Sequence, residues 1–175
     1  LPQNFEINDV AVSSSGSSSY LVLNGTRLGD LSLSPCGSLT GSGATTVSLN
    51  VSTGSPVCHA ARGVTGGEGS GVATDTSGNV YVTGSFSGSV QFFAGADGLL
   101  QSNGATDPYI GSLDAGLNWR WVTGGDRFDA DGLPALGGGP ESDAGTTIAT
   151  AGPGGNLYVG GRFRGEARFA ETDTL

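Results

Sequence analysis

The sequence predicts an all-β protein built from repeats of a four-stranded antiparallel unit. A fifteen-residue phrase occurs three times, at 20–34, 79–93 and 156–170. Self-similarity at a long, nearly fixed period indicates an array of supersecondary units. The 33 glycines and the abundant serine and threonine favour short strands and tight turns. Period-2 alternation, as at 46–51, places one face of a strand on a core, and no amphipathic helix is found. Glycines recur at the same two places of the phrase, at Gly25, Gly84 and Gly161 and then at Gly29, Gly88 and Gly165.

Each copy can be divided into strands and turns in chain order. In the first copy we expect strands at 9–12, 20–25, 46–51 and 57–64. In the second copy we expect them at 71–74, 80–86, 108–113 and 117–122, with 90–93 continuing the strand at 80–86 beyond a bend. Turns are expected at 75–79 and 114–116, because Gly and Asn tolerate positive φ. The third copy has counterparts of the first two strands only, at 147–150 and 156–170, and the second of these would be an exposed edge.

A set of motifs in these copies points to a known family. The pattern is apolar-Ala-apolar, Asp-x-x-Gly-Asn, aromatic-Val-Thr-Gly, x-Phe-x-Gly, then Leu-Asp-x-Gly followed by Trp, and a closing Gly-Gly. It resembles the bacterial beta-propeller repeat family, the SBBP repeats, over residues 7–175 apart from 126–143. The resemblance implies a partial β-propeller of about two and a half four-stranded antiparallel blades, on secreted or surface proteins of bacteria, with no catalytic residue. The expected division is 1–68 for blade 1 with an N-terminal extension, 69–125 for blade 2, 126–143 for an inter-blade loop insertion, and 144–175 for a partial blade 3.

Two and a half blades do not close a ring, since a propeller needs about four to eight of them. Three arrangements follow: the chain is a piece of a longer propeller, several copies close a ring together, or a partner pairs with the exposed edge. The expected partners are therefore other copies or further blades of the same protein, and surface or appendage proteins.

Charge and hydropathy exclude two classes of partner. The formal net charge is −9, and all seven basic residues are arginines. This acidic field repels a polyanion, so no nucleic acid is expected as a partner. Arg162, Arg164 and Arg168 would share one face of a strand, as a solvated edge rather than an anion site. No run approaches the roughly twenty apolar residues of a membrane span.

Cys36 and Cys58 lie in the same copy and are expected to form a disulfide, with two free thiols as the alternative. An even cysteine count in a lysine-free chain rich in Ser, Thr and Gly fits an oxidising, extracellular or cell-surface setting. His59 is the only histidine, and no nucleophile and base recur together in the copies. His59 is therefore expected at the surface or in blade packing, and the protein is not expected to be an enzyme.

Three long loops are expected to share one face of the propeller, at 34–44, 94–106 and 126–143. Function on rigid β scaffolds tends to reside in such loops. The candidate partner-binding residues there are Asp97, Asn103, Asp129 and Asp131.

The acidic cluster Asp126, Asp129 and Asp131 resembles part of a calcium loop. Arg127 stands in place of the first ligand and no acidic residue stands at the twelfth position, so a solvated loop is expected, with no metal and no cofactor. Trp119 and Trp121 are expected on one side of a strand, as a sugar platform or as packing between blades.

The resulting functional expectation is a non-catalytic, extracellular β-propeller module, serving as a structural or protein-interaction element of a bacterial cell surface or appendage. Two alternatives stay open. One is a carbohydrate-binding, lectin-like propeller, and the other is a fragment of a larger propeller enzyme.

Overall fold

The all-β prediction is confirmed. The computed structural model describes residues 4–15, 18–52, 57–102, 104–124, 141–151, 156–164, 168–170 and 173–174. In this part of the chain every strand pairs antiparallel, and the only helical element is one 3₁₀ turn, η1 (Ala96–Gly98).

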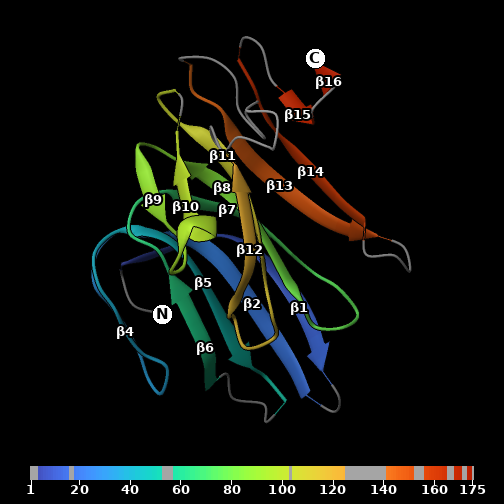
Figure 1. Ribbon diagram of the computed structural model, residues 1–175. Coiled ribbons are helices and arrows are strands. Elements are labelled where there is room, and N and C mark those ends of the chain that lie inside the picture. The colour runs from blue at the N-terminus through green and yellow to red at the C-terminus, as the bar shows by residue number, and fades with distance from the viewer. Residues whose placement is uncertain are drawn as a thin grey trace.

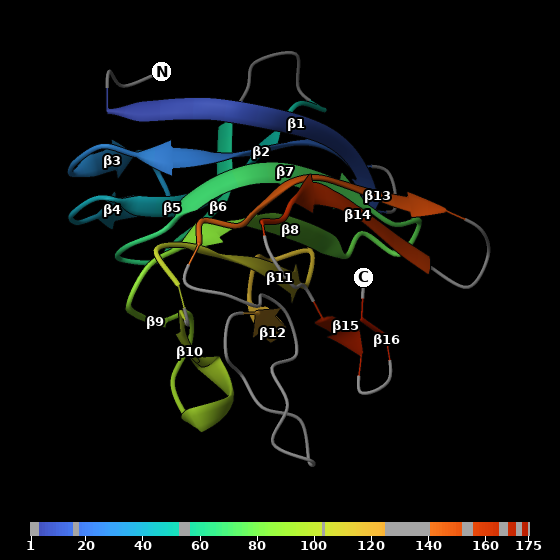
Figure 2. The same ribbon diagram turned by 90° about the horizontal axis from the view of Figure 1, so that it is seen from above.

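In the described residues, the longer strands form two four-stranded sheets and one two-stranded sheet, and the short strands form three further two-stranded hairpins (Figures 1 and 2). The first sheet has the order β1 (Phe5–Ser15), β2 (Ser18–Arg27), β5 (Gly43–Asn50) and β6 (Val57–Gly63). The second has the order β7 (Glu68–Thr74), β8 (Val80–Phe86), β11 (Asp107–Leu113) and β12 (Trp119–Gly124). The third consists of β13 (Ala144–Ala151) and β14 (Asn156–Arg162). These sheets have the form of partial propeller blades, and the described residues form no closed ring. We call them blades 1, 2 and 3.

A short hairpin follows the second strand of each blade. The hairpins are β3 (Leu31–Leu33) with β4 (Gly37–Leu39), β9 (Ser89–Gln91) with β10 (Leu99–Gln101), and β15 (Arg168–Ala170) with β16 (Asp173–Thr174). The expectation that 90–93 continues β8 is therefore wrong. Gly88, with φ of 64°, turns the chain between β8 and β9. The expected edge strand at 156–170 is likewise interrupted after Arg162.

The repeated glycine of β2, β8 and β14 is explained by a β-bulge in the strand beside it. Register shifts occur opposite each of these glycines, and the extra residue is Asn8 in β1, Ser70 in β7 and Thr146 in β13. A Cβ at Gly25 would lie 1.9 Å from the carbonyl oxygen of Glu6, and a Cβ at Gly84 would lie 1.9 Å from that of Glu68. Only glycine allows the bulged strand to approach this closely.

Two aspartates organise the hairpin turns of blade 2. Asp75 Oδ1 accepts the N–H groups of Ser77 and Asn79, and its Oδ2 accepts the Tyr81 hydroxyl at 3.0 Å. Asp114 Oδ1 accepts the N–H groups of Gly116 and Asn118 in the same way. Burial alone would raise the pKa of each carboxyl, but the hydrogen bonds outweigh it and lower both pKa values. In each turn, the aspartate carboxylate therefore fixes the backbone by accepting its N–H groups.

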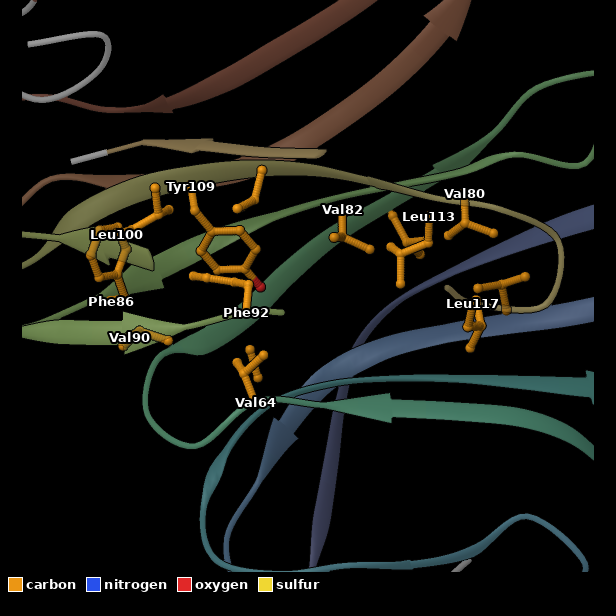
Figure 3. Packing of buried hydrophobic residues seen from close by; sticks show 14 residues of the cluster. Val64, Val80, Val82, Phe86, Val90, Phe92, Leu100, Tyr109, Leu113 and Leu117 are labelled. Atoms are coloured by element: carbon orange, nitrogen blue, oxygen red, sulfur yellow. The ribbon is translucent and has the colours of Figure 1, made fainter. Parts of the chain in front are cut away.

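The main core lies between blades 1 and 2 (Figure 3). Val22, Ala44 and Val64 of blade 1 meet Val72, Val80 and Val82 of blade 2, beside the aromatic cluster of Phe86, Phe92 and Tyr109. A smaller cluster of Ala73, Tyr81 and Ile148 joins blade 2 to blade 3. A third cluster, which includes Leu23, Leu31 and Val47, lies on the other side of blade 1. The first strands of the blades are neighbours, because β7 contacts both β1 and β13.

Candidate functional site

The strand register aligns the three blades residue by residue. Gly25, Gly84 and Gly161 pair with Ile7, Gly69 and Gly145. Counting from these pairs gives the equivalent positions in the three blades. Each blade is a sheet with two faces. In blades 2 and 3, the preceding face is the one that packs on the blade before it in the chain, and the following face is the opposite one; the equivalent faces of blade 1 take the same names.

One position on the preceding face is buried twice and exposed once. Val10, Val72 and Ile148 are equivalent, because they pair with Leu23, Val82 and Val159 in the same register. Val72 and Ile148 are 4% and 5% exposed beneath the neighbouring blade, whereas Val10 is 51% exposed. Ile7 and Val12 share the side of β1 with Val10 and are also exposed. The β1 part of the preceding face of blade 1 is thus apolar and exposed to solvent, whereas Leu23 on the same face is buried in the cluster with the β3–β4 hairpin.

One position on the following face behaves in the converse way. Val22, Tyr81 and Tyr158 are equivalent and pair with Ala11, Ala73 and Ala149. Val22 is 1% exposed and Tyr81 is 8% exposed, but Tyr158 is 59% exposed. Blade 3 therefore exposes, on its following face, the position that is buried between blades in blades 1 and 2.

Hydrogen bonds between the first strands accompany this packing. The Thr74 hydroxyl donates to the carbonyl oxygen of Val12 at 2.7 Å, and the equivalent Thr150 hydroxyl donates to the carbonyl oxygen of Thr74 at 2.8 Å. Blades 1 and 2 are further joined by the Val72 N–H, which donates to Asp9 Oδ2 at 2.8 Å, and by Asn24 Nδ2, which donates to the Gly71 carbonyl at 3.0 Å. The inter-blade contact thus combines apolar burial with a repeated polar bond.

Blade 3 also differs at its strand edge. The outer edge of β2 pairs with β5, and that of β8 pairs with β11. Within the described residues, β14 pairs with β13 alone. An edge of this kind offers backbone N–H and C=O groups to an added strand.

A polar groove of about 660 Å³ lies where the second strands end and the first strands of blades 2 and 3 begin. It contains the ends of the loops at 34–44 and 94–106, together with Ser142 at the end of the 126–143 segment and Ala144 just after it. Its lining includes two bulge residues, Ser70 and Thr146, and the residues that follow the shared glycine, Thr26, Ser85 and Arg162. The remaining hydroxyl-bearing lining residues are Ser42, Ser87, Thr106 and Ser142, and Glu68 and Arg27 are the other charged ones.

Arg27 is the largest fully buried side chain of the described chain, although its sequence context did not mark it. Its guanidinium donates to the carbonyl oxygens of Gly41, of Thr40 at 2.8 Å and of Val64 at 3.4 Å. Burial lowers the pKa of Arg27, and the nearby charge of Asp30 partly opposes this shift. The carbonyl contacts hold the loop before β5 against the end of blade 1, so Arg27 shapes one wall of the groove.

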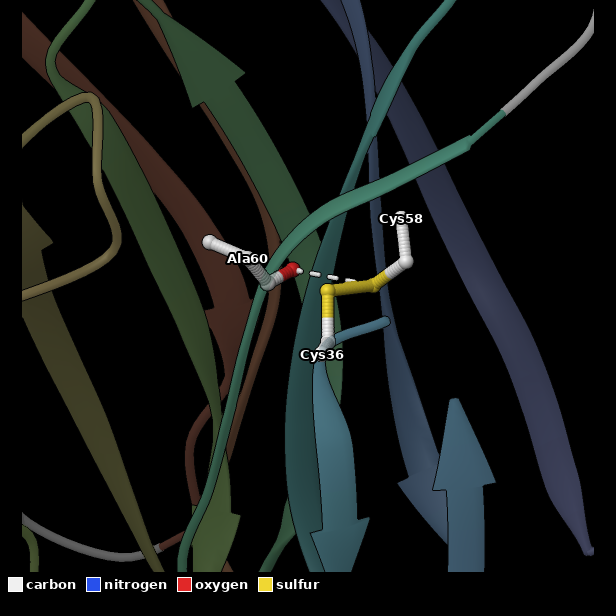
Figure 4. The surroundings of a disulfide bond; sticks show 3 residues. All are labelled: Cys36, Cys58 and Ala60. Atoms are coloured by element: carbon white, nitrogen blue, oxygen red, sulfur yellow. Dashed lines mark hydrogen bonds between the residues drawn. A yellow bond between two sulfur atoms is a disulfide. The ribbon is translucent and has the colours of Figure 1, made fainter. Parts of the chain in front are cut away.

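The predicted disulfide is confirmed (Figure 4). The Cys36 and Cys58 sulfur atoms are 2.06 Å apart, and the bond joins the β3–β4 turn to β6, the last strand of blade 1. His59 is exposed beside it, with its ring centroid 4.7 Å from that of Tyr20. Neither a cysteine nor a histidine lines the groove among the described residues.

The expectation that Trp119 and Trp121 share one side of a strand is wrong. A bulge in β12 makes Trp119 pair with Leu113 and Trp121 pair with Ser112, which are adjacent residues on opposite faces of β11. Trp119 packs against Phe92 and Phe93, with ring centroids 5.3 Å and 6.4 Å away, whereas Trp121 is exposed. The two indoles cannot form one sugar platform.

The acidic candidates are only partly described. Asp97 is exposed within η1, in the loop between β8 and β11. Asn103, Asp126, Asp129 and Asp131 lie outside the described residues, so their roles in partner or calcium binding stay predictions. In the described ranges, no three His, Cys, Asp or Glu side chains are grouped so that they could hold a metal ion.

The predicted alignment of three arginines on one strand is also wrong, because β14 ends at Arg162. Arg164 follows the strand, and its N–H donates to Asp143 Oδ1 at 2.8 Å. Arg168 belongs to the separate strand β15.

Several contact residues were not found from the sequence. Arg62 of β6 donates to the Leu117 carbonyl and to Asn118 Oδ1, both at 2.7 Å, and so ties blade 1 to the last turn of blade 2. Asp143 is fully buried, and its N–H donates to the Thr106 carbonyl at 2.8 Å. The only signal for Asp143 was its place just before the first strand of a copy.

No helix in the described ranges is long and apolar enough to cross a membrane.

The comparisons with known proteins concern the repeat itself. No curated protein matches the chain. The family description "SBBP: Beta-propeller repeat" matches residues 63–85, which contain the Gly66-Gly67 turn, all of β7 and most of β8. The match confirms the resemblance identified from the motifs over residues 63–85, and these residues carry a beta-propeller repeat of the SBBP family.

Proposed function

We propose that the chain is a non-catalytic β-propeller module that serves as a structural or protein-interaction element on the outside of a bacterial cell. The observation that carries this proposal is the pair of open blade faces. The apolar position of Val10 and the position of Tyr158 are both buried wherever a neighbouring blade is present. Apolar surface of this kind, on a rigid sheet, is typical of a protein-binding site.

Two further observations support the proposed setting and the absence of catalysis. The Cys36–Cys58 disulfide is compatible with an oxidising, extracellular compartment. The serine hydroxyls of the groove have no histidine beside them in its described lining, and nucleophilic catalysis by serine needs such a positioned base.

The test uses the oxidised chain as immobilised bait for proteins of a bacterial envelope extract. The comparison is the double variant V10D/Y158D, which places a charge on each open face. We expect the wild-type chain to retain a protein that the double variant does not retain, and that protein, once identified and purified, to bind again with the same dependence. Equal retention by both baits, or no binding by the purified protein, would show that the faces are not interaction surfaces.

The groove favours a second candidate function, carbohydrate binding. Hydroxyl groups line this one groove at positions that are equivalent in neighbouring blades, Thr26 with Ser85 and Ser70 with Thr146. A glycan array with the wild-type chain and with Ser87→Trp, which fills the groove from an exposed position, tests it. A defined glycan signal that Ser87→Trp abolishes would support this function, and an array without signal would exclude it for the sugars displayed.

A further inference from the structure

We propose that the partner of the open faces is a second copy of this chain, docked head to tail. The preceding face of blade 1 in one copy would cover the following face of blade 3 in the next. This inference rests on the proposed function, because it names the partner of the same surfaces.

The internal contacts define the proposed contact. In the chain, a preceding face meets a following face twice, through Val72 against Val22 and through Ile148 against Tyr81. The next contact of the same kind would place Val10 against Tyr158. Both residues are apolar, as at the two formed contacts, and both are more than half exposed, at 51% and 59%. In the described chain, no other blade covers Val10 or Tyr158. A head-to-tail contact between copies would therefore repeat the contact that already joins the blades.

The polar bond between first strands refines the geometry. At the two formed contacts a threonine hydroxyl, from Thr74 or Thr150, donates to the carbonyl of the equivalent residue in the blade before. In the proposed contact the acceptor is the carbonyl oxygen of Thr150 and the donor position is Val12 of the second copy. Valine has no hydroxyl, so this contact lacks the bond and should be weaker than the internal ones. Val12→Thr would restore it.

Charge adds a second expectation. Each copy has a formal net charge of −9, so two copies repel one another at low ionic strength. Salt screens this repulsion, with a Debye length of about 10 Å at 0.1 M, while it leaves apolar burial in place. Association should therefore strengthen as salt is raised.

The experiment is a complementation between two single-face variants, followed by sedimentation velocity. Val10→Asp destroys only the preceding face of blade 1, and Tyr158→Asp destroys only the following face of blade 3. We expect the wild-type chain to associate with rising concentration, each variant alone to stay monomeric, and an equimolar mixture of the two variants to form dimers that do not grow further. Only a head-to-tail contact gives this combination, because the mixture retains one intact pair of unlike faces.

Matched variants keep the outcome clear. Val57→Asp changes an apolar residue of β6 that is 47% exposed and lies away from β1, and it should leave association unchanged. Val12→Thr should tighten the mixed dimer about fivefold, the effect of one added hydrogen bond. Circular dichroism melting establishes that each variant is folded, as expected for substitutions at exposed positions.

Three results would overturn the proposal. The wild-type chain could stay monomeric at high protein and salt concentration. Either single-face variant could dimerise alone, which would mean that like faces meet. Val12→Thr could weaken the mixed dimer, which would mean that the faces meet in another geometry. A monomeric wild-type chain that still captures a different envelope protein through Val10 and Tyr158 would remove the second copy as partner and leave the proposed function standing.

Discussion

Replacing Gly84 by alanine tests the account of the repeated glycine. The new Cβ would lie 1.9 Å from the Glu68 carbonyl oxygen and 2.8 Å from Tyr109 Cε1. Carbon and oxygen normally approach no closer than about 3.3 Å, so β7 would have to move by more than an ångström against a packed core. Overpacking of this kind costs about 3 kcal/mol. In a chain of this length, that loss corresponds to a fall in melting temperature of about 6–12 °C.

Gly29 provides the matched control, because it is the second glycine that the copies share. A Cβ at Gly29 would meet only the Asn4 side chain, with its nearest atom 3.5 Å away, which is an ordinary contact. Gly29→Ala should therefore leave the free energy of unfolding within about 0.5 kcal/mol of wild type. Differential scanning calorimetry of the two variants measures the contrast. Equal melting temperatures for Gly84→Ala and Gly29→Ala would refute the reasoning that the bulge requires the first glycine.

Three further predictions concern stability. Replacing both Cys36 and Cys58 by alanine should lower the free energy of unfolding by about 3 kcal/mol, because the 22-residue separation of the cysteines sets the loop entropy removed from the unfolded chain. Urea denaturation with and without reductant measures this loss. An unchanged denaturation midpoint would contradict the prediction. The pKa values of Asp75 and Asp114 are lowered in the folded protein, so the unfolded chain takes up protons first and stability should fall as the pH drops below the usual value of 3.8. Melting temperatures from pH 6 to pH 2 should fall less steeply for Asp75→Asn than for wild type, and identical slopes would exclude a role for this carboxyl. Arg27→Met should cost about 2 kcal/mol, because carbonyl acceptors of the loop before β5 lose a buried charged donor; chemical denaturation measures it, and a change below about 0.5 kcal/mol would argue against the role of Arg27 in holding this loop.

Features that depend on local spacing were accessible from the sequence. The four-stranded unit follows from alternation and turn residues, because a strand with one buried face must repeat every second residue. The Asp75 turn follows from Asp-x-x-Gly-Asn, because a short carboxylate reaches the N–H groups two and four residues on. The Cys36–Cys58 bond was predicted because the pair lies within one copy of the repeat.

Other features were decided by tertiary contacts between segments distant in the chain. Gly25 and Gly29 recur equally in the phrase, yet only Gly25 faces a backbone carbonyl, since the bulge belongs to another strand. Trp119 and Trp121 have strand spacing, but the bulge in β12 turns them to opposite faces. Val10 and Val72 occupy the same place in their copies. Val72 is buried because a neighbouring blade covers it, and Val10 is exposed because no blade covers it in the described chain. The sequence by itself determined the repeated four-stranded unit, because the pattern of that unit is local. Which side chains are buried, and which face of a sheet they occupy, was decided by the packing of one sheet against another.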